Sequence, residues 1–250
     1  MMTLPFDAKT WAIITAGGRS QRFNAGRIPT DASQHKLLQE IKGQSVLAWS
    51  VRGVLESSCI QGAVLTLPQG DESLFEAELQ RIRLSFPNQT VLACTGGHSR
   101  RASVYAGLTH LKTQCEMTSS DLVVIHDGAR PLLNPLWLNE AVETLRQHPD
   151  WHGVIAGHAV TDTLKQVQGS RIEKTVSREG LYAVQTPQVF RFDPLWQAHN
   201  GVDDSIDATD DAQLLELYFG ESCQLQIQAS LLSNLKITTL EDLALARFYL

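Results

Sequence analysis

The chain has few of the features that mark secreted, membrane-bound and nucleic-acid-binding proteins. Its 250 residues include 4 cysteines and no C-x-x-C pair, so neither a zinc site nor a disulfide framework is predicted. No apolar run is long enough to span a membrane, and the first residues, MMTLPFDAKTW, lack the basic and apolar regions of a signal peptide. A net charge of −6 gives no support to nucleic-acid or membrane binding, so any basic site must be local. We therefore expect a cytoplasmic protein with reduced thiols and with neither nucleic acid nor membrane as partner.

What the chain does have is a regular alternation of short apolar runs and amphipathic runs. Strands that alternate with helices of this length indicate a single α/β, Rossmann-like domain over residues 1–250, built on a mostly parallel, doubly wound sheet. Ligands of such sheets lie beyond the carboxyl ends of the strands, so functional residues should follow the strands. Predicted strands cover 11–15, 63–67, 90–94, 122–127 and 153–160, and predicted helices cover 45–57, 71–84, 99–113 and 135–148.

The pattern changes after residue 160, where TDTLKQVQGSRIEKTVSREG is polar and contains QGSR, a hairpin turn between two alternating runs. A hairpin this polar suits a projecting arm or lid better than the central sheet. Beyond it we predict a strand from residue 181, a helix capped by Asp207 or Thr209, and a short strand over 234–238. A last helix should open at a capping box formed by Thr238 and Glu241.

The stretch TAGGRSQRF, residues 15–23, follows the first predicted strand and has two interpretations. It lacks the Gly-Lys-Ser/Thr of a Walker A loop and the G-x-G-x-x-G of a dinucleotide site. Gly17 and Gly18 nevertheless allow backbone amides to approach a ligand closely, and Arg19 and Arg22 can donate to phosphate oxygens. Taken alone, the stretch is either a phosphate cradle or a plain turn with solvated arginines.

A second candidate is VVIHDGARP, residues 123–131, at the end of a very apolar strand. A carboxylate there is costly unless it is paired or holds a metal, so Asp127 is a candidate metal ligand. Arg130 could neutralise an anion in the same crevice, or simply form a salt bridge with Asp127. We interpret His126 as a packed histidine that hydrogen bonds satisfy.

A third candidate, TGGHSRRASVYAGL at 95–108, places a glycine pair before a helix that carries Arg100 and Ser103. It is either an anion site or base-edge site at a helix N-terminus, or an ordinary capped helix. Lys36 precedes an apolar stretch and, alone, suits a solvated surface group. A basic pocket with one metal-binding carboxylate suits chemistry on phosphates, where catalysis is mainly positioning and charge neutralisation. The candidate cations are Arg22, Lys36, Arg100, Arg130 and Lys236.

These motifs together carry a family resemblance. AGGRSQRF with Lys36 is similar to the signature of nucleotidyltransferases, and the later motifs occur in the order seen in the 2-C-methyl-D-erythritol 4-phosphate cytidylyltransferases, from about residue 11 onward. The resemblance implies transfer of CMP from CTP to 2-C-methyl-D-erythritol 4-phosphate, with release of pyrophosphate and with Mg²⁺ as cofactor, in non-mevalonate isoprenoid biosynthesis. The motifs are GGHSRRASVYAGL, HDGARP, VTDTLK, TVSREGLYAVQTPQVF, ATDDAQLLE and SNLKITTLEDLALA.

The resemblance also implies a role for each matched residue. Arg22, Lys36 and Lys236 match catalytic cations, and Asp127 matches the magnesium ligand. Residues 158–182 match a dimerisation arm that grips the neighbouring subunit, which implies a homodimer whose sites are completed across subunits. The matched nucleotide-binding residues are Ala16, Gly17, Gly18, Arg22, Lys36, Gly97, Arg100, Ser103 and Asp127, and the matched polyol-phosphate-binding residues are Arg130, Thr163, Arg178, Thr186, Thr209 and Lys236.

Two alternatives stay open at this point. A ribitol-5-phosphate cytidylyltransferase shares the fold, TPQ and the last lysine motif, although VTDTLK and SREGL resemble the methylerythritol family more. A non-catalytic nucleotide-binding homologue draws support from the altered glycine loop, in which Gly17 and Ser20 depart from the family pattern, as does His98 elsewhere. The presence of Asp127, Lys36 and Arg22 argues against the non-catalytic alternative.

Overall fold

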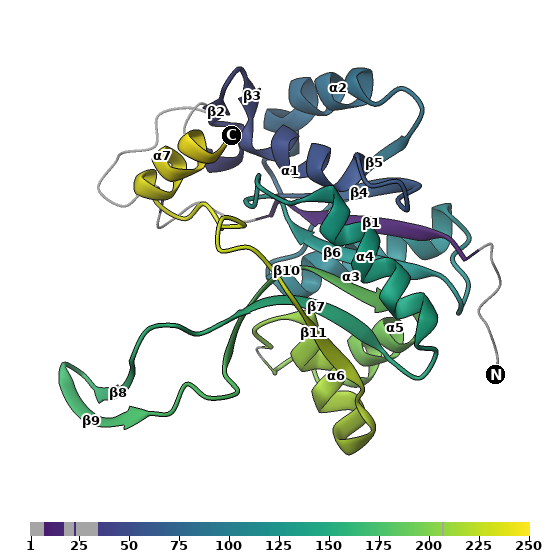
Figure 1. The fold of residues 1–250 in the computed structure, drawn as a ribbon. Coiled ribbons are helices and arrows are strands. Elements are labelled where there is room, and N and C mark those ends of the chain that lie inside the picture. Colours follow the sequence, from purple (N-terminus) through teal and green to yellow (C-terminus); the bar gives the residue numbers. More distant parts are fainter. Residues whose placement is uncertain (1–7, 18–22, 24–34, 207) are drawn as a thin grey trace.

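The fold is a twisted seven-stranded sheet with helices on both faces (Figure 1). The computed structural model describes residues 8–17, 23, 35–206 and 208–250. The strand order is β11-β7-β10-β6-β1-β4-β5, and within the described residues only β10 runs antiparallel to its neighbours in this sheet. The strands are β1 (Thr10–Thr15), β4 (Gly62–Leu67), β5 (Thr90–Thr95), β6 (Leu122–Asp127), β7 (Gly153–Ala159), β10 (Tyr182–Arg191) and β11 (Leu225–Ala229). The predicted doubly wound, mostly parallel sheet is therefore confirmed.

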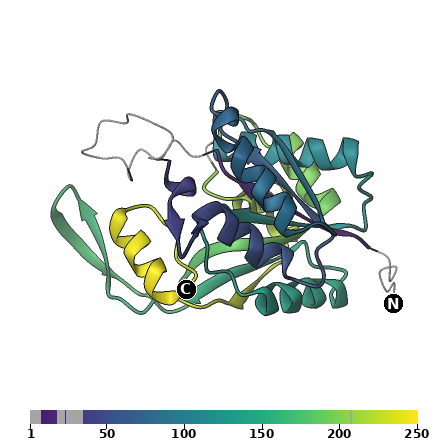
Figure 2. The same cartoon turned by 90° about the horizontal axis from the view of Figure 1, so that it is seen from above.

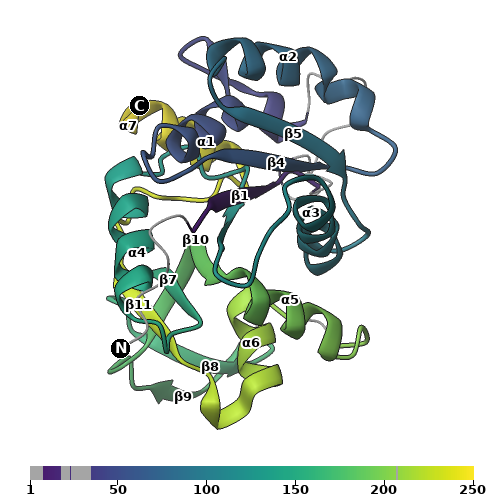
Figure 3. The same cartoon turned by 90° about the vertical axis from the view of Figure 1, so that its right-hand side faces the viewer.

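Alternate residues of the strands supply two separate cores. From β1, Ala12 and Ile14 pack in the core on the side of α1 and α4, and Trp11 and Ile13 pack on the side of α3, α5 and α6. Figure 3 shows the two helical layers on opposite sides of the sheet. The helices are α1 (Val46–Leu55), α2 (Glu76–Ser85), α3 (Arg100–Gln114), α4 (Pro135–Gln147), α5 (Phe192–Gly201), α6 (Asp211–Phe219) and α7 (Leu240–Tyr249). In the described ranges, no helix is both long and apolar enough to cross a membrane.

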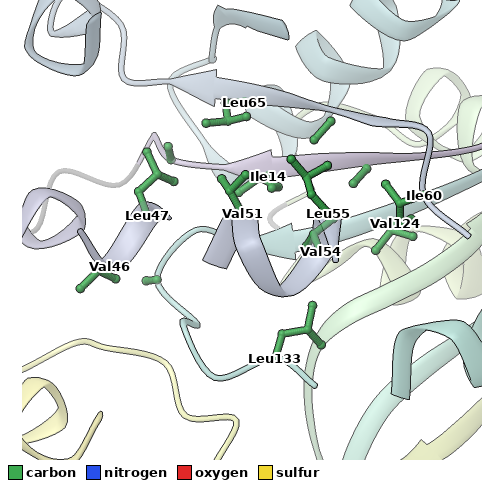
Figure 4. Packing of buried hydrophobic residues seen from close by; sticks show 14 of the residues in the cluster. Ile14, Val46, Leu47, Val51, Val54, Leu55, Ile60, Leu65, Val124 and Leu133 are labelled. Carbon is green, nitrogen blue, oxygen red and sulfur yellow. The ribbon is translucent and has the colours of Figure 1, made fainter. Parts of the chain in front are cut away.

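Helix α1 shows how the local sequence forms this architecture. Ser45 caps it by accepting a hydrogen bond from the amide of Ala48 at 2.9 Å. Its apolar side chains Leu47, Val51 and Val54 are fully buried against the sheet (Figure 4). Each such burial contributes about 1.5–3 kcal/mol, so packing rather than helix propensity holds α1 in place.

The polar insertion forms the predicted hairpin. Strands β8 (Leu164–Gln168) and β9 (Arg171–Val176) pair with each other as a separate two-stranded sheet. Gly169, at a φ of 58°, occupies the turn, where glycine carries no steric cost. The hairpin projects away from the main sheet in two perpendicular views (Figures 1 and 2), and its side chains are mostly exposed.

Several predictions for the C-terminal third were wrong. Residues 234–238 form no strand; β11 instead forms one edge of the sheet, where its alternating LQIQA pairs with β7. Asp210, not Thr209, caps α6, because its side chain accepts from the Gln213 amide; Asp207, the other predicted cap, lies outside the described residues. Helix α5 was not predicted.

The capping box of α7 lies one residue beyond the predicted one. It joins Thr239 to Asp242 rather than Thr238 to Glu241, because Asp242 stands at the third helical position. The Asp242 carboxylate also accepts from the amide and the hydroxyl of Thr238, at 2.8 and 2.6 Å.

In the amino-terminal half of the chain, the helix predicted over 71–84 is divided into a 3-10 turn, η3 (Glu72–Phe75), and α2. The other short elements are η2 (Lys36–Leu38), β2 (Glu40–Ile41), β3 (Gln44–Ser45) and η4 (Gly220–Ser222).

Candidate functional site

A polar pocket of about 630 Å³ opens where β1, β4, β5 and β6 end. All four are parallel strands, so their carboxyl ends meet at this edge, as the sequence predicts. Thr15 and Asp127 close β1 and β6 side by side, and the N-terminus of α3 and the segment before α7 form further walls. Its lining residues are Thr15, Ala16, Gly17, Phe23, Lys36, Leu37, Pro68, Gln69, Asp71, Gly97, His98, Ser99, Arg100, Ser103, Asp127, Ala129, Lys236 and Thr238.

The Asp127 carboxylate is the centre of charge in this pocket. Its Oδ2 lies 2.8 Å from Lys236 Nζ and 3.5 Å from Arg130 Nε, and its Oδ1 lies 3.7 Å from Arg100 Nε. Burial acts to raise the pKa of Asp127, but the charges of these three cations outweigh it and hold the pKa well below its usual range. The carboxyl is therefore ionised, and the salt bridge to Arg130 that the sequence left open is present.

Backbone geometry places Asp127 in this position. The C-terminal end of β6 is held against β1 by a hydrogen bond from the Gly128 amide to the Thr15 carbonyl, at 2.9 Å. The Asp127 amide donates to Thr186 Oγ1 at 3.0 Å, and the buried His126 faces the same hydroxyl and the Arg130 carbonyl. Burial lowers the pKa of His126 to about 4, so its ring is neutral near pH 7. His126 is thus a packed histidine, as predicted.

The two pocket lysines come from opposite ends of the chain. Lys36, in η2, donates through Nζ to the carbonyl of Ile237 at 3.1 Å, beside Lys236. The irregular segment that carries Lys236 is held by a backbone hydrogen bond from Ile237 to Ala129, at 2.8 Å.

Buried polar contacts of Asn234 secure the same segment further upstream. Its Nδ2 donates to the Thr186 carbonyl at 2.9 Å, and its own carbonyl accepts from Arg130 Nη1 at 2.7 Å. These contacts, rather than strand pairing, position Lys236.

Another wall of the pocket is a glycine-rich surface. The Gly97 amide lies 3.2 Å from Ser103 Oγ, and a Cβ on Gly97 would clash with the side chain of Ala102. Ser99 caps α3 through its side chain. Gly17 lies directly beside Ser103, since a Cβ on Gly17 would lie 3.2 Å from Ser103 Oγ. This wall has no room for larger side chains, so backbone groups are presented to whatever the pocket holds.

Arg100, the first residue of α3, lines the pocket and contacts both Asp127 and Asp211. Its Nη1 donates to Asp211 Oδ2 at 2.6 Å. Burial acts to lower the pKa of Arg100, but Asp211 and Asp127 hold it above its ordinary value, so the side chain stays charged.

The structure brings together part of the predicted site. Eight predicted residues line the pocket: Ala16, Gly17, Lys36, Gly97, Arg100, Ser103, Asp127 and Lys236. Arg130 and Thr186 lie directly behind it, bonded to Asp127. Thr209 is exposed at the start of α6, and Thr163 and Arg178 flank the projecting hairpin, with Arg178 donating to the Thr161 carbonyl. Gly18 and Arg22 lie outside the described residues.

Sequence reasoning missed several pocket residues. Pro68 and Gln69 follow β4 directly, so the rule that functional residues follow parallel strands could have found them. The sequence indicates Thr238 only as a helix cap, although it lines the pocket. Asp211 lies behind the pocket lining and carries no local signal, because it meets Arg100 across a separation of 111 residues.

A magnesium ion fits the donor set of this pocket. Within the described ranges, no group of three or more His, Cys, Asp or Glu side chains could form an all-protein metal site. Mg²⁺, however, is commonly held by one or two carboxylates together with substrate phosphates and water. The ionised Asp127 offers Oδ1, whose contacts among the described residues are the longer ones to Arg100 Nε at 3.7 Å and Thr15 Oγ1 at 3.4 Å.

Comparison with known proteins gives a consistent result. The family model for 2-C-methyl-D-erythritol 4-phosphate cytidylyltransferase matches residues 10–250. A relative of that name from Nostoc sp. is 35% identical over 242 residues, which cover 96% of this chain and 97% of the relative. A second, from Dehalococcoides mccartyi, is 34% identical over 245 residues, covering 98% and 97%.

Solved structures agree in fold. A crystal structure of 4-diphosphocytidyl-2C-methyl-D-erythritol synthase has a TM-score of 0.76 at 26% identity, covering 97% of this chain and 99% of that one. The synthase from Anaerococcus prevotii also has a TM-score of 0.76, at 24% identity, covering 97% and 96%, and shows likeness of fold.

Proposed function

Because the chain belongs to the 2-C-methyl-D-erythritol 4-phosphate cytidylyltransferase family, we propose that it transfers a cytidylyl group from CTP to 2-C-methyl-D-erythritol 4-phosphate. The observation that carries the proposal is the arrangement around Asp127, an ionised carboxylate in a pocket lined by Lys36, Lys236 and Arg100. Such a pocket carries excess positive charge beside one carboxylate that could hold a metal, and this suits a triphosphate better than an apolar or neutral ligand.

The proposed reaction is a displacement at the α-phosphorus of CTP. A phosphate oxygen of the polyol phosphate forms a bond to that phosphorus, and the bond to the bridging oxygen breaks, so that pyrophosphate leaves. Lys36 and Lys236 would neutralise the phosphate oxygens and hold the two reactants in line. Mg²⁺ held by Asp127 would supply further neutralisation of charge on the phosphates. Arg22, which lies outside the described residues, is proposed as an additional catalytic cation.

We place the nucleoside against the glycine-rich wall. Gly97, Ser103 and the backbone of Ala16 and Gly17 present small groups there, and such groups allow a planar base to approach closely. His98 also lines this part of the pocket and is a further candidate for contact with the base.

The polyol-phosphate side is proposed to be completed by a second subunit. Thr163 and Arg178 flank the hairpin and do not line the pocket. The hairpin itself exposes the apolar side chains of Val167 and Ile172, at 52% and 59%, which a homodimeric contact would cover. Exchange of this arm between subunits would bring Arg178 to the partner's pocket.

A cytoplasmic location of the protein stays a prediction.

The test is steady-state release of pyrophosphate with each nucleoside triphosphate paired with either 2-C-methyl-D-erythritol 4-phosphate or ribitol 5-phosphate. We expect turnover with CTP and 2-C-methyl-D-erythritol 4-phosphate, and loss of turnover when EDTA removes divalent cations. Turnover with ribitol 5-phosphate alone would contradict the proposed acceptor. Absence of turnover with every pair would leave nucleotide binding without catalysis.

A further inference from the structure

Asp211 is a buried charge that the proposed reaction does not use. Its side chain is 0% exposed at the first residue of α6, where Asp210, not Asp211, supplies the helix cap. A buried carboxylate is costly unless it is paired and hydrogen-bonded. The cap of α6 therefore does not explain why an acidic residue is buried at this position.

Both oxygens of Asp211 are committed to partners on other helices. Oδ2 accepts from Arg100 Nη1 at 2.6 Å, and Oδ1 lies 3.0 Å from Nε2 of the buried His199 on α5. The opposing charge of Arg100 outweighs burial and lowers the pKa of Asp211, so the carboxyl stays ionised. Asp211 itself does not line the pocket, whereas Arg100 does.

Arg100 contacts two carboxylates at unequal distances. Its contact with Asp211 is 2.6 Å, and its Nε lies 3.7 Å from Oδ1 of Asp127. Without Asp211, the nearest counter-charge would be Asp127, whose Oδ1 is the oxygen left for a metal. Arg100 Nη2 is buried and has no hydrogen-bond partner within the described part of the chain, so one donor of the guanidinium is left uncommitted.

We propose that Asp211, itself held by His199, is a positioning residue: it holds the Arg100 guanidinium at the pocket wall for contact with bound nucleotide, and it keeps Arg100 from approaching Asp127 more closely than the observed 3.7 Å. This inference rests on the proposed function. It assigns Asp211 an effect on nucleotide affinity that passes entirely through Arg100.

The test is calorimetric titration of CTP, with Mg²⁺ present, into the wild-type protein and variants. Asp211→Asn keeps the shape of the side chain and removes its charge. We expect the Kd for CTP to rise about tenfold, within the range found for coupled charged pairs, with a matching rise in KM and a smaller change in kcat. Asp211→Glu restores the charge and should recover most of the affinity. Asp204→Asn is the matched control, because Asp204 pairs with the neighbouring Arg101 at 3.3 Å but is 100% exposed.

A double-mutant cycle separates positioning from a merely structural role. In an Arg100→Met background, Asp211→Asn should add no further loss of CTP affinity. His199→Gln acts one step further from the pocket, so it keeps the test open if Asp211→Asn does not fold. It should weaken CTP binding less than Asp211→Asn, and only while Arg100 is present.

An unchanged Kd in Asp211→Asn, or an equal loss in the Arg100→Met background, would overturn the inference. Failure of the wild-type protein to bind CTP would instead overturn the proposed function and this inference with it, and the wild-type arm alone reports that outcome.

Discussion

Removing the charge of Asp127 should both destabilise the fold and slow the reaction, because the cations around this carboxylate lose the charge that balances them. Asp127→Asn keeps the shape of the side chain but leaves Lys236, Arg130 and Arg100 without their shared counter-charge. Losing one partner of a fully buried ion pair costs about 3–5 kcal/mol. Lys236 is 37% exposed, so solvent screens part of the repulsion, and we expect a loss of about 2 kcal/mol.

The assay is urea unfolding followed by tryptophan fluorescence, for which the chain has 5 tryptophans. With an m-value of about 3 kcal/mol/M, the midpoint of Asp127→Asn should fall by about 0.7 M at pH 7. Asp204→Asn, which removes a fully exposed partner of Arg101, should shift the midpoint by less than about 0.2 M. Because the pKa of Asp127 is lower in the folded state, its contribution is complete above the unfolded-state value of about 3.9 and is lost below it.

The difference between wild type and Asp127→Asn should therefore be constant from pH 5 to 7 and shrink below about pH 4. Turnover of Asp127→Asn should fall by about a hundredfold or more, the scale for loss of a group that supports charge neutralisation at the reacting phosphate. Inorganic triphosphate without Mg²⁺ should bind at least as tightly as to wild type, because a repelling carboxylate is gone. Equal stability of the two proteins, or weaker binding of metal-free triphosphate, would refute this account of the pocket charge.

Three further outcomes are expected from the same structure. Lys36→Ala should lower turnover by about a hundredfold with little change in melting temperature, whereas alanine at the exposed Lys42 should change neither; full activity of the first variant would place the triphosphate elsewhere. Arg178→Ala mixed with Lys36→Ala should regain part of the activity in verified mixed dimers, and no rescue there would argue against shared sites. His126 has a pKa of about 4 when folded, so the unfolded state binds the extra proton below about pH 6.5. The free energy of unfolding of the protein should therefore fall by up to about 1.4 kcal/mol for each unit by which the pH is lowered from 6.5 to 4. A His126→Gln variant that keeps this slope would contradict the assignment.

Much of the fold could be predicted because its strands carry local patterns. β1, β4, β5, β6 and β7 are continuous apolar runs, which predicted their position to within a residue or two. The rule that ligands lie beyond the carboxyl ends of parallel strands then led directly to Asp127 and Gly97.

The parts that could not be predicted depend on contacts between distant segments. LQIQA becomes β11 because β7 offers a free edge, and nothing within those residues specifies this. Residues 234–238 look like a strand, yet Asn234 is bonded to Thr186 and Ile237 to Ala129, so the segment crosses toward the pocket. Arg100 and Asp211 meet only when α3 and α6 pack on the same face of the sheet.

The most direct test of the central claim follows the phosphate oxygens. The polyol phosphate, labelled with ¹⁸O in its non-bridging phosphate oxygens, is incubated with CTP, Mg²⁺ and the protein. The ¹⁸O content of each product is then measured by mass spectrometry. Attack of this phosphate on the α-phosphorus predicts that all label stays in the cytidylylated product and none enters pyrophosphate, with the product lost in Lys36→Ala. Label in pyrophosphate, or unlabelled CMP as the main product, would contradict cytidylyl transfer in this pocket.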